Sequence, residues 1–545
     1  MNKKFLIGTL CAASILSPAA AFAASAVPQP GESLPPAPES RPDIETNLPD
    51  TPGSPNSVFR FTLNKIKVEQ SETKCSQKKL EAIAQKATGH EITVEDLDRT
   101  LSELSAYCRN HGYPAAYAYV PDQKAKGGVL TVVIGPGRFG KIKVENEAGI
   151  WDGHRAEGLV AGLKPGDVIR SRTLESALFN INELHGVAAA GALTPGEEEG
   201  TSDLTVRVKQ GKDWSATVYT ENYGSRSSGR YRYGLQASLM DLTCLGGRFT
   251  VGGLLSNSNL HNYNVGWDMP VGHSGTNLGI RYSRMDYELG SIFSEIGANG
   301  IANTLSFFGQ TPLWRTAGSA MVVTYGFDHR QLTDELRSMG IKIKKRSNSA
   351  FLGLDGMVRN GTQTAVHYNL TGHTGKVEPT SEWGSILGEE AGTLGSFNKL
   401  TLDLVGMQQM GKDFDVLFKF SGQKADKNLD SSEQLYLGGA HGVRAYPQGE
   451  GAGDEGCIFT AEVRYHTPIQ GLIFSSYFDI GHVRRAKDGS LGDETLRGWG
   501  LGLTYQHPSN YFARLDYARR IGAPDILSND AQSRQRIWFM AGKTF

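Results

Sequence analysis

The segment Tyr231–Leu239 decides the fold, because its residues Tyr-Arg-Tyr-Gly-Leu-Gln-Ala-Ser-Leu alternate between two kinds of side chain. Successive side chains of a β-strand point to opposite faces of the sheet. The odd-numbered positions are therefore expected to face lipid, while polar residues such as Arg232 face a wet interior. The same alternation returns in Tyr263–Met269, Lys399–Leu404 and Phe414–Phe420. From about residue 214 to the end, Gly-, Asn- and Asp-rich turns separate such runs, which is typical of a transmembrane antiparallel β-barrel.

Alternation alone also fits a soluble β-sandwich, and the start of the chain favours the barrel. Lys3 and Lys4, the apolar stretch Phe5–Ile15 and the small-residue site Ala21–Ala23 form a secretory signal peptide, residues 1–23. No later segment has the roughly 20 apolar residues of a spanning helix, and the mean hydropathy is −0.33. Such an exported chain can cross a bilayer only as a closed barrel, because an open sheet would leave backbone groups unpaired in lipid.

The charge of the chain is nearly balanced, with 56 basic and 57 acidic residues among 545. This balance gives no indication of a nucleic-acid partner. Gly135–Gly140 has the spacing of a dinucleotide fingerprint, but a strand is predicted after it, and no helix N-terminus would be available for a pyrophosphate. The histidines show no ligand spacing, and the sequence contains no nucleophile elbow. We therefore expect no enzyme, and we expect neither a metal nor a cofactor.

Composition divides the mature chain into four parts. Residues 24–57 are rich in Pro, Ser and acidic residues and predict a disordered or polyproline-like linker. Two units of roughly 75 residues follow, 58–135 and 136–211, each in the order strand, helix, helix, strand, strand. The first is predicted from Phe59–Val68, Gln77–Thr88, Val94–Asn110, Ala115–Val120 and Val129–Ile134, and the second from Phe139–Glu145, a helical region near His154–Ala161, Arg172–His185, Val187–Leu193 and Leu204–Lys209. Residues 212–545 remain for the barrel.

The predicted barrel has room for about sixteen strands, because about 330 residues at roughly 20 per strand and connection give a number near that value. A barrel of this size encloses an aqueous lumen. Counting strands back from the C-terminus places a long Gly-rich segment, about residues 425–456, on the outer side of the membrane. The terminal Phe545 fits the aromatic end of outer-membrane barrels, and we expect it to be a barrel-assembly signal.

Four cysteines remain after removal of the signal peptide. Cys75 and Cys108 lie in one small predicted unit, and the oxidising periplasm permits a disulfide between them. Cys244 and Cys457 are predicted near opposite ends of the barrel, and we expect both to be free thiols.

Several motifs resemble those of two-partner secretion outer-membrane transporters of the TpsB type, the haemolysin secretion/activation family. Tyr107–Pro114 together with Gly127–Gly135 looks like part of a POTRA domain, and Glu221–Arg230 resembles the family's first barrel hairpin. The most specific motif, Leu437–Tyr446, is similar to the tip of a long loop that folds into the lumen in this superfamily. The usual tip is Val-Arg-Gly-Tyr, and Ala445 replaces its glycine here. The resemblance implies two periplasmic α+β POTRA domains before the barrel.

The resemblance also implies a clasp between this loop and the barrel wall. Arg444 would bind Asp479, which belongs to an Asp-x-Gly motif that ends at Gly481, and Val443 and Tyr446 would flank the arginine. An arginine can bind a carboxylate through two parallel hydrogen bonds. Without the resemblance, a solvated arginine and an ordinary strand end would be the simpler interpretation.

The function implied is the export of a large haemolysin, adhesin or contact-toxin protein (TpsA type) without ATP. The POTRA domains would bind the unfolded exoprotein by strand addition, with candidate contacts at Leu104, Tyr107, Val129, Leu130 and Val132. Outer-membrane lipids and the barrel-assembly machinery are the other expected partners. A membrane-insertion barrel or a passive channel is the alternative. Some family members have an N-terminal plug helix, which the prolines of residues 24–57 do not support here.

Overall fold

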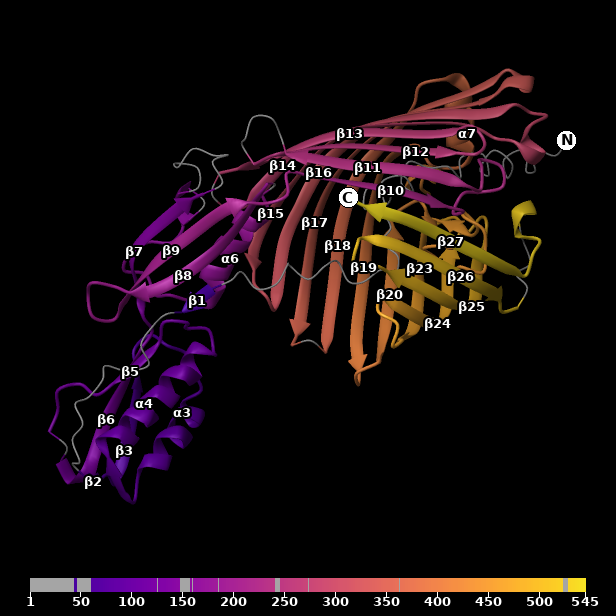
Figure 1. Ribbon diagram of the computed structural model, residues 1–545. Helices are drawn as coiled ribbons and strands as arrows, with labels where there is room; N and C mark the ends of the chain where they lie inside the picture. The colour runs from indigo at the N-terminus through magenta and orange to yellow at the C-terminus, as the bar shows by residue number, and fades with distance from the viewer. Residues whose placement is uncertain are drawn as a thin grey trace.

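The computed structural model of the protein describes residues 44–46, 60–124, 126–147, 157–158, 160–184, 186–240, 246–272, 274–361, 363–522 and 528–545. The predicted signal peptide lies outside these residues. Figure 1 shows two small α/β units followed by a large barrel, with the second unit against the barrel and the first unit farther away. In the described part of the chain, no helix is long and apolar enough to span a membrane.

The barrel is closed and antiparallel, and it has sixteen strands, as predicted. Its strands are β10 (Trp214–Glu221), β11 (Arg232–Met240), β12 (Arg248–Ser256), β13 (Leu260–Val271), β14 (Thr276–Glu288), β15 (Ala298–Arg315), β16 (Ser319–Leu336), β17 (Ile341–Asn360), β18 (Thr364–Pro379), β19 (Gly395–Met410), β20 (Phe414–Ala425), β23 (Glu455–His466), β24 (Leu472–Arg484), β25 (Asp493–Gln506), β26 (Tyr511–Arg520) and β27 (Gln535–Thr544). The first and last strands pair, for example Tyr219 with Gly542, so the barrel has no open edge.

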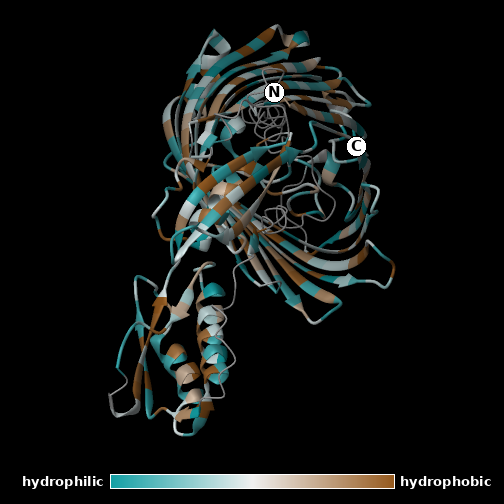
Figure 2. Ribbon diagram, turned by 60° about the vertical axis from the view of Figure 1, so that its left-hand side comes forward, coloured by the Kyte–Doolittle hydropathy of each residue, from teal (hydrophilic) through white to brown (hydrophobic). Residues whose placement is uncertain are grey.

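The alternating apolar and polar side chains of the sequence face the outside and the inside of the barrel in turn. On β11 the side chains of Tyr233, Leu235 and Leu239 are exposed, while Gly234 between them is buried. Figure 2 shows hydrophobic and hydrophilic residues alternating along the strands. Exposed apolar side chains on a closed barrel are stable only against lipid, since water would disfavour so much apolar surface.

The first unit, residues 60–135, contains β2 (Arg60–Thr62), β3 (Lys65–Gln70), α3 (Gln77–Ala84), β4 (Glu91–Thr93), α4 (Val94–Arg109), β5 (Tyr117–Tyr119) and β6 (Val129–Gly135), with 3-10 turns at Gln85–Ala87 and Lys126–Gly128. A capping box begins α4: the Thr93 hydroxyl accepts from the Asp96 backbone N–H, and the Asp96 carboxylate accepts from that of Thr93. The single strand predicted for Phe59–Val68 is two strands, and β4 was not predicted.

The second unit contains β7 (Arg138–Asn146), α6 (Ser171–Asn182), β8 (Val187–Pro195) and β9 (Thr201–Gln210). Of the helical region predicted near His154–Ala161, only residues 157, 158 and 160 are described, and they are helical. The linker prediction is wrong at Ile44–Thr46, which forms β1 and pairs in parallel with β8. Ile44 packs against the core of this unit, so burial of its side chain favours a strand there. The rest of residues 24–57 lies outside the description.

A disulfide joins Cys75, before α3, to Cys108 near the end of α4, with their Cα atoms 6.0 Å apart. Both cysteines are buried in the core of the first unit. Cys457 on β23 is a free thiol, as predicted. Cys244 lies outside the described residues.

Helix α6 attaches the second unit to one end of the barrel. The Ser176 hydroxyl donates to the Arg315 carbonyl at 3.0 Å and accepts from the Arg315 backbone N–H at 2.8 Å. The Arg172 guanidinium lies 4.4 Å from the centroid of the Trp314 ring. These contacts lie at the end of β15 that leads into β16, so this end of the barrel faces the two small units and the opposite end faces away from them.

Candidate functional site in the barrel lumen

A long segment between β20 and β23, residues 426–454, is the lumen loop. It contains a 3-10 turn (Ser431–Glu433) and two short strands that pair with each other, β21 (Leu435–Tyr436) and β22 (Ala452–Gly453). We call residues 437–446 its tip. The Val443 backbone N–H donates to the Leu437 carbonyl at 2.7 Å, which folds the tip into a tight turn. Leu437, Val443, Ala445 and Tyr446 are fully buried, so the tip is packed and not solvated.

The structure brings Arg444 of the tip and Asp479 of β24 together. The Arg444 Nε and Nη2 atoms donate to the two carboxylate oxygens of Asp479 at 2.9 and 2.8 Å, and the Arg444 backbone N–H donates to Asp479 at 3.1 Å. The side chains of Arg444 and Asp479 are 5% and 1% exposed. Water cannot compete well for charges so deeply buried, and the pair is therefore strongly coupled.

The barrel wall adds partners to this pair that the sequence analysis missed. The Arg444 Nη1 atom donates to Glu462 on β23 at 3.1 Å and lies 3.5 Å from Asp516 on β26. The guanidinium carbon lies 3.1 Å from the centroid of the Tyr477 ring. The Trp538 indole N–H donates to the Arg444 carbonyl at 2.7 Å. The clasp, defined as Arg444 with Asp479, Glu462, Asp516, Tyr477 and Trp538, thus joins the tip to four strands.

One signal in the sequence could have found these partners. Thr460, Glu462 and Arg464 alternate with Ala461 and Val463 on β23, and so they share the inward face. Charged residues at inward positions of a barrel are candidate partners for a charge on a loop that enters the lumen. Which inward residues meet is decided by strand register and by loop position, and neither can be read from one strand.

Small residues on the wall make room for the tip. A Cβ atom on Gly481 would stand 2.8 Å from Leu437 Cδ2 and 3.2 Å from Val443 Cγ2. Ala445 packs in the same way over Gly498 of β25, where an added Cβ would stand 2.6 Å from the Ala445 Cβ. The backbone of Ala445 is outside the left-handed region, so this chain does not need the family's glycine there.

We expect Gly498→Ala to weaken the packing of the tip against the barrel wall. Overpacking of a tight contact costs about 1–3 kcal/mol, and the added methyl would meet Ala445, so the loop should open more often. Ala445→Gly should restore much of the closed population, because it removes the opposing methyl. The measurement is the open fraction of single pores in planar bilayers. Gly253→Ala on β12, where an added Cβ has no atom within 4 Å, is the matched control. An equal effect of both alanines, or no rescue, would contradict the prediction.

The structure corrects the predicted binding residues of the first unit. Leu104, Leu130 and Val132 lie in its hydrophobic core and are at most 8% exposed, so they cannot contact an extended partner. Strand β6 lies between β3 and β5: β3 pairs with it along Val129–Ile134, whereas β5 pairs only with Val133–Gly135. Val129 is 39% exposed and Tyr107 is partly buried, and both remain at the surface.

The terminal Phe545 follows the last residue of β27. Its backbone N–H donates to the Ala216 carbonyl of β10 at 2.8 Å, and its side chain is 47% exposed. It therefore lies at the seam where the first and last strands close the barrel. Across the part of the chain that is described, no group of three or more His, Cys, Asp or Glu residues is placed to hold a metal ion.

Comparisons with known proteins agree with this architecture. The heme/hemopexin transporter protein HuxB of Haemophilus influenzae (strain 86-028NP) is 26% identical over 502 residues, which cover 89% of this chain and 88% of HuxB. The outer membrane transporter CdiB of Dickeya dadantii (strain 3937) is 22% identical over 470 residues, 82% of this chain and 80% of CdiB.

Two solved structures have the same fold. CdiB from Escherichia coli superposes with a TM-score of 0.68 at 19% identity, covering 91% of this chain and 93% of CdiB. BamA from Haemophilus ducreyi lacking POTRA domains 1–3 gives a TM-score of 0.52 at 12% identity, covering 89% of this chain and all of that chain. At these identities the likeness establishes the fold alone.

The family match is the decisive finding. Residues 61–137 match the ShlB-type POTRA domain. Residues 200–505, more than half of the chain, match the family described as haemolysin secretion/activation protein ShlB/FhaC/HecB. The POTRA match precedes a closed sixteen-stranded barrel, so the first unit lies in the periplasm and the barrel in the outer membrane. The chain therefore belongs to the haemolysin secretion/activation protein family and is an outer-membrane transporter of two-partner secretion.

Proposed function

We propose that this transporter exports one large, unfolded exoprotein through the barrel lumen, with the lumen loop as its gate. The observation that carries this proposal is the clasp: one buried arginine on a loop inside the lumen is held by carboxylates on the wall. A loop that blocks the lumen must move before a chain can pass. A clasp centred on one loop charge can release reversibly, because no covalent bond is broken.

We infer that residues 136–211 form a second POTRA domain. In the first unit β3 is parallel to β6, and β5 is antiparallel to it. In the second unit β7 is parallel to β9, and β8 is antiparallel to it. The strands of both units therefore have the same order and direction, which supports two copies of one domain. Their edge strands could add an extended segment of the exoprotein, which gives affinity through backbone hydrogen bonds.

The names of the relatives and of the family suggest the class of protein that is exported. HuxB is named as a heme/hemopexin transporter and CdiB as an outer membrane transporter, and the family is named for haemolysin secretion and activation. We therefore propose a haemolysin, adhesin or contact-toxin protein of the TpsA type. Folding of the cargo outside the cell would make its transport through the barrel one-directional. The proposal assigns the chain no ATP hydrolysis and no catalytic step.

The proposal also covers the chain's own assembly. Phe545 lies at the seam of the barrel, where the last strand meets the first. We propose that it is read by the barrel-assembly machinery before that seam closes.

The experiment is a comparison of surface and culture-medium proteins in the native cell with and without this chain. We expect selective loss of one very large protein, which would also identify the cargo. An unchanged set of exported proteins with defective outer-membrane proteins would favour an insertion barrel. An unchanged set with altered permeability would favour a passive channel. Either of these outcomes would overturn the proposal.

A further inference from the structure

The lumen loop carries a second buried set of charges, which precedes Arg444 in the same loop. Asp430 and Glu433 lie in the part of the loop that we call its root, residues 428–434. Their side chains are each 3% exposed. They meet three cations of the barrel wall, Arg330, Lys345 and Lys399, whose side chains are between 9% and 12% exposed. Buried charges without partners are costly, so the root fits this patch of the wall far better than it would fit an apolar one.

The contacts of Glu433 are directional. Its carboxylate accepts from Arg330 Nη1 at 2.6 Å and lies 2.9 Å from Lys399 Nζ. Lys399 Nζ and Gln423 Nε2 both donate to the Glu433 carbonyl at 3.0 Å. Asp430 pairs with Lys345 and also accepts from the Ser432 backbone N–H at 3.1 Å. The root is therefore held by side-chain and backbone groups together.

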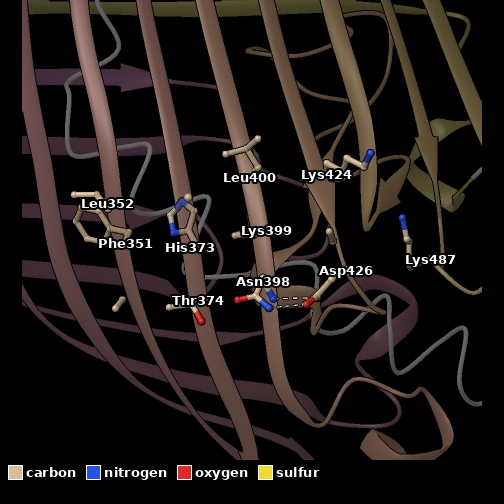
Figure 3. Close-up of a pocket in the computed structure, with 13 residues that line it drawn as sticks. Phe351, Leu352, His373, Thr374, Asn398, Lys399, Leu400, Lys424, Asp426 and Lys487 are labelled. Carbon is tan, nitrogen blue, oxygen red and sulfur yellow. Dashed lines mark hydrogen bonds between the residues drawn. The ribbon is translucent and has the colours of Figure 1, made fainter.

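This second set uses a different part of the wall from the clasp. Arg330, Lys345 and Lys399 belong to β16, β17 and β19, whereas the carboxylates of the clasp belong to β23, β24 and β26. Lys399 on β19 and His373 on the adjacent strand line a cavity of about 800 Å³ along β17 to β20. Figure 3 shows these side chains. The loop thus contacts the wall on both sides of its own attachment to β20 and β23.

The two contacts also have opposite polarity. At the tip, a cation of the loop enters an acidic part of the wall. At the root, two anions of the loop enter a basic part of the wall. Burial raises the pKa of the Asp430 and Glu433 carboxyls, but Lys345, Arg330 and Lys399 outweigh burial and hold both pKa values below their ordinary values. Both acids are therefore ionised at neutral pH.

A purely structural role for these charges is the alternative. Arg464 and Asp415 are a buried ion pair with a purely structural role: the Arg464 Nε atom donates to the Asp415 carboxylate at 2.6 Å. Those two residues lie on the adjacent strands β23 and β20, so their pair survives any movement of the loop. The pairs of Asp430 and Glu433 exist only while the root lies against β16 to β19. Their energy therefore counts toward the closed position of the loop.

We propose that Asp430 and Glu433 form a second anchor, the root anchor, which holds the lumen loop closed independently of the clasp. The inference rests on the proposed function, because it assumes that the loop is the gate. The closed state is then stabilised by two separate sets of contacts. Opening then requires the release of both.

The test is single-pore recording of the full-length protein in planar bilayers, with the variants Glu433→Gln, Arg444→Ala and both together. We expect Glu433→Gln to raise the open fraction about tenfold, which corresponds to about 1.4 kcal/mol. The effects of the two variants should multiply, because separate contacts with no shared partner are additive in free energy. Glu378→Gln is the matched control, since Glu378 pairs with Arg346 at the outer end of β18, outside the loop. Recording counts only inserted pores, so misfolded protein cannot imitate opening.

The outcomes separate the inference from the proposed function. If Arg444→Ala opens the pore while Glu433→Gln behaves like Glu378→Gln, the root anchor is wrong and the gate stands. If the double variant opens no more than Arg444→Ala alone, the anchor is not independent, and the inference is again overturned. If neither single variant changes the open fraction, the loop is not the gate, and the proposed function fails with it.

Discussion

Replacing Arg444 by alanine is expected to reduce export by about tenfold or more while the barrel still reaches the outer membrane. The substitution leaves Asp479 and Glu462 buried with one loop cation fewer, and removal of one partner from a buried pair costs about 3–5 kcal/mol. The tip is then no longer held on the wall, and the clasp cannot form and break in each export cycle. The barrel itself is held by backbone pairing between strands, which the substitution does not touch.

The measurement is the amount of cargo on the surface and in the medium, with the folded barrel quantified by its heat-dependent mobility on gels. Arg464→Ala is the matched control, because Arg464 is an equally buried lumen arginine whose partner Asp415 lies on the wall. Arg444→Lys keeps the charge without the two parallel hydrogen bonds and should give an intermediate level. Normal export by correctly inserted Arg444→Ala protein would refute the clasp.

Locking the tip onto the wall is expected to stop export almost completely. The positions are Val443 and Gly481, since Val443 Cγ2 lies 3.2 Å from where a Cβ on Gly481 would stand. A disulfide needs Cβ atoms about 3.5–4.5 Å apart. The Val443 Cγ2 atom is one bond from the Val443 Cβ, so the two positions are close neighbours across this contact. A Val443→Cys, Gly481→Cys variant oxidised in intact cells would hold the loop in the lumen. Export should resume when the bond is reduced, because the obstruction is then removed.

The measurement is export before oxidation, after it and after reduction. The chain without the two substitutions must pass through the same cycle, because its own Cys75–Cys108 bond experiences the same reagents. The Gly481→Cys single variant shows the effect of crowding Leu437, which would lie 2.8 Å from the new Cβ. Unchanged export through a fully cross-linked barrel would mean that the cargo takes a route other than the one the loop blocks.

These two expectations constrain each other. Export should fail when the loop is never held, as in Arg444→Ala. It should also fail when the loop is never released, as in the cross-linked variant. Export then requires a clasp that forms and breaks within the working cycle. A substrate can shift a closed gate only as far as it binds the open state more tightly than the closed one.

The sequence predicted the barrel well because the relevant signal is local. Tyr233, Leu235 and Leu239 were expected to face lipid, and they do so because a strand has a repeat of two residues wherever it occurs. The helix that begins at Val94 was predicted from Thr93 and the acidic first turn, and its cap is present. The linker prediction failed at Ile44–Thr46, since its composition says nothing about the free edge of β8 that those residues meet.

The candidate site was likewise predictable from the sequence only in part. The sequence by itself, through its resemblance to a known family, determined that Arg444 and Asp479 belong together. Only the tertiary structure decided that Glu462, Asp516 and Trp538 complete the clasp, that Gly498 accommodates Ala445, and that Leu104, Leu130 and Val132 are core. The reason is physical. Alternation is a property of neighbouring residues, whereas these contacts join strands far apart in the chain, and they exist only once the barrel closes and the loop folds into its lumen.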